Sequence, residues 1–473
     1  MFGKMKLQEV NIRLDRIIFH IDVNSAFLSW EAVYRLAHKG GRADLREMAS
    51  AVGGDAALRH GIILAKSIPA KRYGIQTGET IWEAKKKCPE LVLVPPDYGL
   101  YEKCSAALME ILRDYSDVVE PYSIDEAFVD MSASCHLFGT PEKAAEQIKE
   151  RIYRTLGFTV NVGVSSNKLL AKMASDFQKP DRVHTLYPEE ICEKMWPLPV
   201  SDLFFVGRAT SGKLRSMGIR TIGELAKSDP AWLKGILKKQ GEVIWAFANG
   251  IDLSPVLAEP EANKGYGNST TIPFDVTDEE TADRVLLALS ETVAHRLRAD
   301  HVQAGVVSVG IRYADFSYIS HQRGFYNPTN ITTEIHKTAC MLFREVWNGM
   351  PVRHLAIHTT RIDGEESWRQ GDLFDPADYG KLSRLNGAVD RIRDCFGIDS
   401  VKRAVFLNQP IDHMSGGISR EKRSVDDSLR EEDRSWHLEL ASIPGSLLEA
   451  VSGEYKKRLR VSAGLPAQGK SCL

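Results

Sequence analysis

The chain has 473 residues, of which 43% are hydrophobic and 26% are charged, so we expect about three or four domains with separate cores. Seven cysteines, 36 glycines and 20 prolines are too few for a disulfide scaffold, a collagen-like chain or a wholly disordered protein. The formal net charge of −2 does not by itself indicate a polyanionic partner, so any nucleic-acid binding must rest on local basic patches.

The first part of the chain alternates predicted strands and helices. Residues 17–21 form an apolar run typical of a buried strand, which ends at Asp22. The next helix has apolar residues at helical spacing, and residues 29–81 are predicted to form a compact insertion with two small strands. The pattern continues with helices at 100–115, 143–156 and 167–176 and strands within 118–131 and at 158–164. This order predicts a mixed sheet with helices on one face.

The second part of the chain contains two further regions, one of short helices and one of mixed strands and helices. Residues 188–254 contain short helical segments punctuated by glycines, with an excess of four positive charges between 198 and 250. A linker over 255–267 leads to a second β/α domain over 268–408. Its predicted strands lie at 268–274, 304–313, 316–324 and 352–362, and its helices at 280–298 and 332–347. Residues 409–473 contain the run 420–434, which is dense in both charges, so we expect a flexible or only partly helical tail.

The sequence contains no candidate membrane span or secretion signal. No apolar run approaches the roughly 20 residues that cross a bilayer. The N-terminal residues carry charges throughout, unlike the apolar core of a signal peptide. The cysteines form no Cys-x-x-Cys pair and have no histidine at a zinc-like spacing, which indicates reduced thiols. We therefore expect a cytoplasmic protein.

Three carboxylates stand at the ends of predicted strands. Asp22 ends the first strand, and Asp125 and Glu126 lie at the polar turn between two others. Neighbouring strand residues point to opposite faces, but at a turn both can reach one site. Such carboxylates would form an oxygen-only site for hard cations such as Mg²⁺. The alternatives are a helix N-terminal carboxylate for Asp22 and a solvated turn for the other two.

Three segments in register favour the metal site. They are His20–Glu31, Tyr122–Ala127 and Gly163–Asp176 with its extension to Lys179–Pro180. These segments resemble motifs of the Y-family translesion DNA polymerases and are similar to those of bacterial polymerases IV and V. The match in order and spacing runs from about residue 17 to residue 408. The resemblance implies an error-prone, template-directed DNA polymerase that adds deoxynucleotides to a primer 3′ end during damage bypass. Because the residues after 408 are too few for a proofreading nuclease, we expect modest fidelity.

The family resemblance also implies an α+β, multidomain right-hand architecture. Its parts would be a palm, small fingers, a helix-hairpin-helix thumb and a β/α little finger. The boundaries are 1–28 and 82–187 for the palm, 29–81 for the fingers, 188–254 for the thumb, 255–267 for the linker, 268–408 for the little finger and 409–473 for the tail.

The resemblance assigns roles to the carboxylates and to one lysine. Asp22, Asp125 and Glu126 would hold two Mg²⁺ ions, and the carbonyl of Val23 would complete the second site. Lys168 begins a predicted helix, so its ammonium could face the phosphates of a deoxynucleoside triphosphate. The alternative for Lys168 is an exposed surface lysine.

Residues near the expected nucleotide depart in part from the family pattern. Phe27 aligns with the steric gate, a bulky ring that would clash with a 2′ hydroxyl, whereas helical spacing alone favours a core aromatic. The usual aromatic before the gate is replaced by Ala26. In the predicted fingers, Ile68 and Lys71 stand where a Tyr and an Arg often contact the triphosphate, so Lys71 supplies only a point charge. Arg72 is a candidate substitute.

The predicted thumb resembles a helix-hairpin-helix, which binds duplex phosphates through backbone N–H groups and basic side chains. The candidate contacts to primer-template DNA are Gly207, Arg208, Lys213 and Arg215. Phe204–Phe205 replaces the usual Pro-Gly of the hairpin. The alternative is an ordinary helical subdomain with solvated lysines.

A short segment of the predicted little finger resembles the peptide that docks on the bacterial sliding clamp. Its anchors would be Gln370, Leu373 and Phe374, and Gly371 replaces the customary Leu. A five-residue match can also arise by chance. We expect the protein to be a monomer that does not bind a membrane. Its partners would be DNA, deoxynucleoside triphosphates and this clamp.

Two other function classes compete with the polymerase. One is a catalytically silent DNA-binding or scaffold relative, which the retention of Asp22, Asp125, Glu126 and Lys168 disfavours. The other is a nucleotidyl cyclase, which also uses paired carboxylates and two metals. The basic thumb and the clamp-like peptide disfavour a cyclase, because neither has a role on a free nucleotide.

Overall fold

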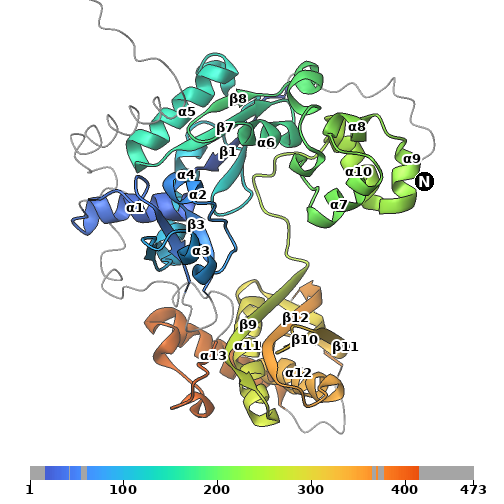
Figure 1. Ribbon diagram of the computed structural model, residues 1–473. Helices are drawn as coiled ribbons and strands as arrows, with labels where there is room; N and C mark the ends of the chain where they lie inside the picture. The colour runs from blue at the N-terminus through green and yellow to red at the C-terminus, as the bar shows by residue number, and fades with distance from the viewer. Residues whose placement is uncertain (1–15, 42, 55–60, 365–368, 371–377, 415–473) are drawn as a thin grey trace, which may run out of the picture.

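The computed structural model describes residues 16–41, 43–54, 61–364, 369–370 and 378–414 (Figure 1). These residues form three sheets with their helices. The central sheet has the strand order β5-β6-β1-β7-β8. Its strands are β1 (Ile18–Val23), β5 (Val119–Pro121), β6 (Glu126–Asp130), β7 (Val160–Ser165) and β8 (Val183–Thr185). Because β1 is antiparallel to β6 and β7 while β7 is parallel to β8, the predicted mixed sheet is confirmed.

Helices cover both faces of the central sheet, so the prediction of helices on one face was wrong. The odd positions of β1, such as Phe19 and Ile21, share a core with α4 (Tyr98–Arg113) and α5 (Pro141–Leu156). The even positions face α6 (Lys168–Asp176), which packs on β1 and β7. The close approach of α6 depends on Gly163, since a Cβ there would lie 1.9 Å from a backbone oxygen of α6.

The predicted insertion forms a small unit with its own sheet, which extends beyond residue 81. Its helices are α1 (Ala26–His38), which leads into it, α2 (Ile68–Arg72) and α3 (Ile81–Lys87), and its strands are β2 (Ser50–Gly53), β3 (Ile63–Lys66) and β4 (Val92–Val94). The strand order is β3-β2-β4. Because β4 pairs with β2 in parallel, this unit reaches residue 94 and the predicted boundary at 81 was too early.

Residues 188–248 form the expected set of short helices. Their bounds are η2 (Pro188–Glu190), η3 (Ile191–Met195), η4 (Val200–Asp202), α7 (Arg208–Ser216), α8 (Ile222–Ala226), α9 (Pro230–Leu237) and α10 (Lys239–Ala248). Their apolar residues share one core with Leu169 and Met173 of α6. This unit therefore packs directly on the helix that covers the central sheet.

The last unit contains a four-stranded sheet of order β11-β10-β12-β9. Its strands are β9 (Gly265–Val276), β10 (Val302–Tyr313), β11 (Tyr318–Thr329) and β12 (Val352–Gly364), and its helices are α11 (Glu279–Ala299), α12 (Thr332–Val346) and α13 (Tyr379–Phe396). Every strand and helix predicted within 268–362 is confirmed. Because β9 begins at 265, the linker is shorter than predicted.

The predicted flexible tail does not begin at residue 409. Ile411, His413 and Met414 are buried, because they pack against the end of the last unit. Residues 415–473 lie outside the described part of the chain. Within the described ranges, no helix has both the length and the hydrophobicity needed to cross a membrane.

Candidate active site

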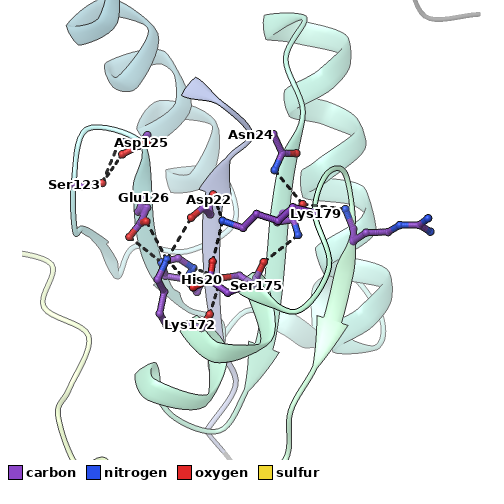
Figure 2. Close-up of polar contacts among 12 residues, drawn as sticks. His20, Asp22, Asn24, Ser123, Asp125, Glu126, Lys172, Ser175 and Lys179 are labelled. Carbon is purple, nitrogen blue, oxygen red and sulfur yellow. Dashed lines mark hydrogen bonds and ion pairs between the residues drawn. The ribbon is translucent and has the colours of Figure 1, made fainter. Parts of the chain in front are cut away.

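Asp22 and Glu126 are direct cross-strand partners on β1 and β6. Both side chains lie on the face that α6 covers, where Lys172 reaches between them (Figure 2). Its Nζ lies 3.3 Å from Asp22 Oδ2 and 2.9 Å from Glu126 Oε1. The two carboxylates therefore share one buried cation.

A second lysine approaches Asp22 from the turn that follows α6. Lys179 Nζ lies 2.8 Å from Asp22 Oδ1. A pair of buried amides holds this turn in place: Asn24 Nδ2 donates to Asn161 Oδ1 at 3.1 Å, and Asn24 Oδ1 accepts from the Asp181 N–H at 2.9 Å. The turn is thereby tied to β1 and β7, and its lysine is held at the carboxylate.

Asp125 is next to this pair but points elsewhere. Its carbonyl accepts from the Val23 N–H at 3.0 Å, while its carboxylate accepts from the Ser123 hydroxyl at 2.7 Å. Figure 2 shows the side chain turned toward Ser123 and away from Asp22. Among the residues described, Asp22, Asp125 and Glu126 do not form a group in which one oxygen from each lies within 4.8 Å of both others. The predicted convergence is therefore partial, because Ser123 holds the third carboxylate.

Burial and the lysines shift the proton affinities of this cluster in opposite directions. Burial raises the pKa of Asp22 above its ordinary value, against the attraction of Lys179 and Lys172. Burial also raises the pKa of Glu126, but His20 and Lys172 outweigh this effect and lower it. Burial lowers the pKa of His20 to about 4, so its ring is neutral at pH 7.

A pocket of about 600 Å³ opens beside Asp22. Asp125, Lys179 and Phe27 line it together with residues of α2. The Phe27 ring stacks on Tyr101 of α4, with centroids 4.4 Å apart and planes inclined by 12°. Because Tyr101 provides this support, the ring is held firmly although Ala26 lacks an aromatic side chain.

The three fingers residues singled out in the sequence all line this pocket. They are Ile68, Lys71 and Arg72 of α2. Ser67 caps the N-terminus of this helix, because its hydroxyl accepts from the Ala70 N–H. Lys71 and Arg72 are both exposed at the pocket wall, so both can meet an anionic ligand there.

Lys168 does not line the pocket, contrary to the prediction of a phosphate-facing lysine. Its Nζ lies 2.6 Å from Glu120 Oε1 and 4.8 Å from the centroid of the Phe128 ring. The cause is the path of α6 across the sheet: Lys168 lies over β5 and β6, and Lys172 lies one turn further along, over Asp22. Lys172 and Lys179, and not Lys168, are thus the lysines that contact Asp22.

The remaining predicted binding residues lie away from the pocket. Arg208, Lys213 and Arg215 are exposed on α7, and Gly207 caps its N-terminus. The backbone of Gln370 exchanges two hydrogen bonds with the Asn327 side chain at the end of β11. The other clamp anchors, Leu373 and Phe374, lie outside the described residues.

Sequence reasoning missed His20, Lys172, Lys179 and Tyr101. Strand periodicity could have indicated His20, because it lies two residues before Asp22 and hence on the same face. Both lysines lie within the matched motif segment. No local pattern indicated Tyr101, since its stacking on Phe27 joins two helices far apart in the chain.

Comparison with known proteins agrees with this architecture. Residues 21–176 match the impB/mucB/samB family, residues 263–373 match the C-terminal domain of that family, and residues 201–252 match the thumb domain of DNA polymerase iota. A solved Y-family DNA polymerase chimera of Dbh and Dpo4 superimposes with a TM-score of 0.62, at 22% identity, over 73% of this chain and 99% of its own.

This chain matches its curated relatives over nearly the whole length of each relative. The DNA polymerase IV of Clostridium acetobutylicum is 42% identical over 396 residues, covering 84% of this chain and 99% of the relative. That of Acetivibrio thermocellus is 40% identical, covering 83% and 98%, and DNA polymerase IV 1 of Bacillus subtilis is 37% identical, covering 83% and 94%. The chain therefore belongs to the Y family of translesion DNA polymerases.

Proposed function

We propose that this chain extends a primer 3′ end on a DNA template by two-Mg²⁺ phosphoryl transfer, as an error-prone polymerase of damage bypass. The observation that carries the proposal is the pair of Asp22 and Glu126, which Lys172 bridges, with Asp22 also lining the pocket. Template-directed synthesis requires a nucleotide pocket next to a cation site, and a pocket that Asp22 lines supports such an arrangement.

The donor set fits Mg²⁺. Asp22, Asp125 and Glu126 would hold the ions, together with the Val23 carbonyl. An ammonium already lies within 3.3 Å of two of these carboxylates, so the position suits a cation. The donors are all oxygen atoms, which Mg²⁺ prefers. When bound, Mg²⁺ activates the primer hydroxyl and neutralises charge on the triphosphate.

The protein's own groups would bind and orient the nucleotide. Lys179, Lys71 and Arg72 offer positive charge along the pocket, where the triphosphate oxygens would lie. Phe27, held by its stacking on Tyr101, would lie under the sugar and exclude a 2′ hydroxyl. The aligned reactants would then react by in-line attack on the α-phosphate, with pyrophosphate leaving.

The thumb and the little finger would bind the duplex without reading its sequence. Arg208, Lys213 and Arg215 present exposed positive charge on α7, and residues 318–324 of β11 are exposed along a sheet edge. Such contacts go to phosphates, so binding should weaken as salt rises. We infer that the enzyme works as a cytoplasmic monomer that docks on a sliding clamp through residues 370–374. Replacing Leu373 and Phe374 by alanine should abolish stimulation by the clamp.

Primer extension by an Asp125→Ala variant tests the proposed site. We expect Mg²⁺-dependent extension to be lost while DNA binding, measured by fluorescence anisotropy, is retained. Asp114→Ala is the matched control, since Asp114 pairs with Arg151 away from the pocket. Unchanged extension by Asp125→Ala would refute the assignment. Wild-type protein that binds DNA but never extends a primer would favour the catalytically silent relative.

A further inference from the structure

His20 is a buried polar residue for which the proposed reaction has no role. It is fully buried on β1, two residues before Asp22. Its ring packs against Phe128, its cross-strand partner, with centroids 4.7 Å apart. A buried imidazole costs stability unless its nitrogens find partners, so the partners indicate what the residue does.

Each ring nitrogen faces one polar group. Nδ1 lies 2.8 Å from the hydroxyl of Ser175 on α6. Nε2 makes no short hydrogen bond within the described residues, and it faces Glu126 Oε2 at 3.5 Å. The imidazole thus lies between a serine of α6 and one of the carboxylates of the proposed metal site (Figure 2).

The number of available protons favours one arrangement of the hydrogen bonds among Ser175, His20 and Glu126. The neutral ring carries one N–H, and the serine hydroxyl carries one proton. If Ser175 donated to the Lys172 carbonyl, 2.8 Å away, the ring proton would lie on Nδ1 and donate to the serine oxygen. The Nε2 lone pair would then face a carboxylate. If Ser175 instead donates to Nδ1, the ring proton lies on Nε2 and points at Glu126. The second arrangement places a donor between the ring and the Glu126 carboxylate, where the first would place a lone pair.

The two oxygens of Glu126 then have different donors. Lys172 Nζ lies 2.9 Å from Oε1, and His20 Nε2 faces Oε2. We propose that His20 is a positioning residue, held by Ser175, which fixes the plane of the Glu126 carboxylate for a metal ion shared with Asp22. This inference rests on the proposed metal-binding role of Glu126.

Substitutions of His20 or Ser175 should lower the metal affinity more than they lower the stability of the fold. Partners that orient metal ligands typically change affinity by about 10–100-fold when they are removed. His20→Gln can place its amide N–H near the position of Nε2 and should retain most of the effect. The shorter His20→Asn cannot reach Glu126, so it serves as a polar control of matched chemistry. Ser175→Ala removes the group that orients the ring with a smaller change of volume.

The test is Mn²⁺ binding to the protein–DNA complex, followed by electron paramagnetic resonance without turnover. We expect Ser175→Ala and His20→Asn to weaken binding by at least about tenfold, and His20→Gln by no more than a few fold. Urea unfolding of each variant verifies that it is folded. Wild-type affinity in Ser175→Ala, or equal losses in the Gln and Asn variants, would overturn the proposal.

A Glu126→Gln variant separates this inference from the proposed function. If Glu126→Gln abolishes Mn²⁺ binding while Ser175→Ala and His20→Asn bind like wild type, the metal site stands and the positioning role is wrong. If Glu126→Gln binds Mn²⁺ as well as wild type does, the proposed metal site itself is wrong, and the positioning role is wrong with it.

Discussion

Replacing Lys172 by methionine should cost more stability than any exposed lysine substitution in this chain. Its side chain is only 9% exposed, and its ammonium lies between two carboxylates. Removing one partner of a buried ion pair costs about 3–5 kcal/mol. Lys179, at 2.8 Å from Asp22, still neutralises one carboxylate, so we expect a loss of about 2–4 kcal/mol.

Divalent cations should restore part of this loss, because they can take the position of the missing ammonium. An ion present at 100 times its dissociation constant stabilises the folded state by about 2.7 kcal/mol. We therefore expect millimolar Mg²⁺ to stabilise Lys172→Met more than wild type. We expect no such difference for Lys234→Met, because the exposed pair of Lys234 with Glu242 contributes at most about 1 kcal/mol.

Urea unfolding with and without Mg²⁺, followed by circular dichroism, measures both effects. A Lys172→Met variant as stable as wild type would show that the ammonium does not hold the two carboxylates. Equal stabilisation of the variant and the wild type by Mg²⁺ would show that a divalent cation does not take its position.

Three further predictions concern the gate, a buried ion pair and a glycine. Phe27→Ala should raise ribonucleotide incorporation relative to deoxyribonucleotides by on the order of 100-fold in single-nucleotide kinetics, whereas unchanged discrimination would place the gate elsewhere. Burial raises the pKa of Asp390, but its hydrogen bonds, including those from Arg298, lower it to about 2. Its stabilisation of about 2 kcal/mol should therefore be present above pH 4 and disappear as the pH falls toward 2, and Asp390→Asn should remove this dependence in urea unfolding. Gly163→Ala should destabilise the fold by about 3 kcal/mol or more, because the added Cβ would meet the α6 backbone. The control is Gly212→Ala, whose added Cβ would meet nothing within 4 Å and should be neutral or stabilising. Thermal unfolding measures both.

Much of the fold could be predicted from periodicity, because long strands and amphipathic helices leave a clear pattern. The elements of the last unit illustrate this: β10 and β12 begin and end within two residues of their predicted bounds. Sequence periodicity did not predict the elements whose position depends on tertiary packing. β4 has only three residues, too few for a period, and it joins the small sheet by pairing with β2, whose residues lie 42 positions earlier in the chain. The position of α6 on the second face depends on the contact at Gly163, which no local pattern indicates.

The site could be predicted as far as its motifs reach. Asp22 and Glu126 lie side by side as expected, since strand order and turn position bring them together. The choice between Lys168 and Lys172 could not be made from sequence, because the two lie one helical turn apart on the same side of α6. Only the strands that α6 crosses determine which lysine reaches Asp22 and which pairs with Glu120.

The most direct test of the account is the number of metal ions bound in the polymerising complex. Mn²⁺ can be titrated into the protein bound to a dideoxy-terminated primer, its template and the next deoxynucleotide. We predict two tightly bound ions in the wild type and the loss of at least one in Asp22→Asn. A complex that binds the same number of ions with and without the Asp22 carboxylate would contradict the account.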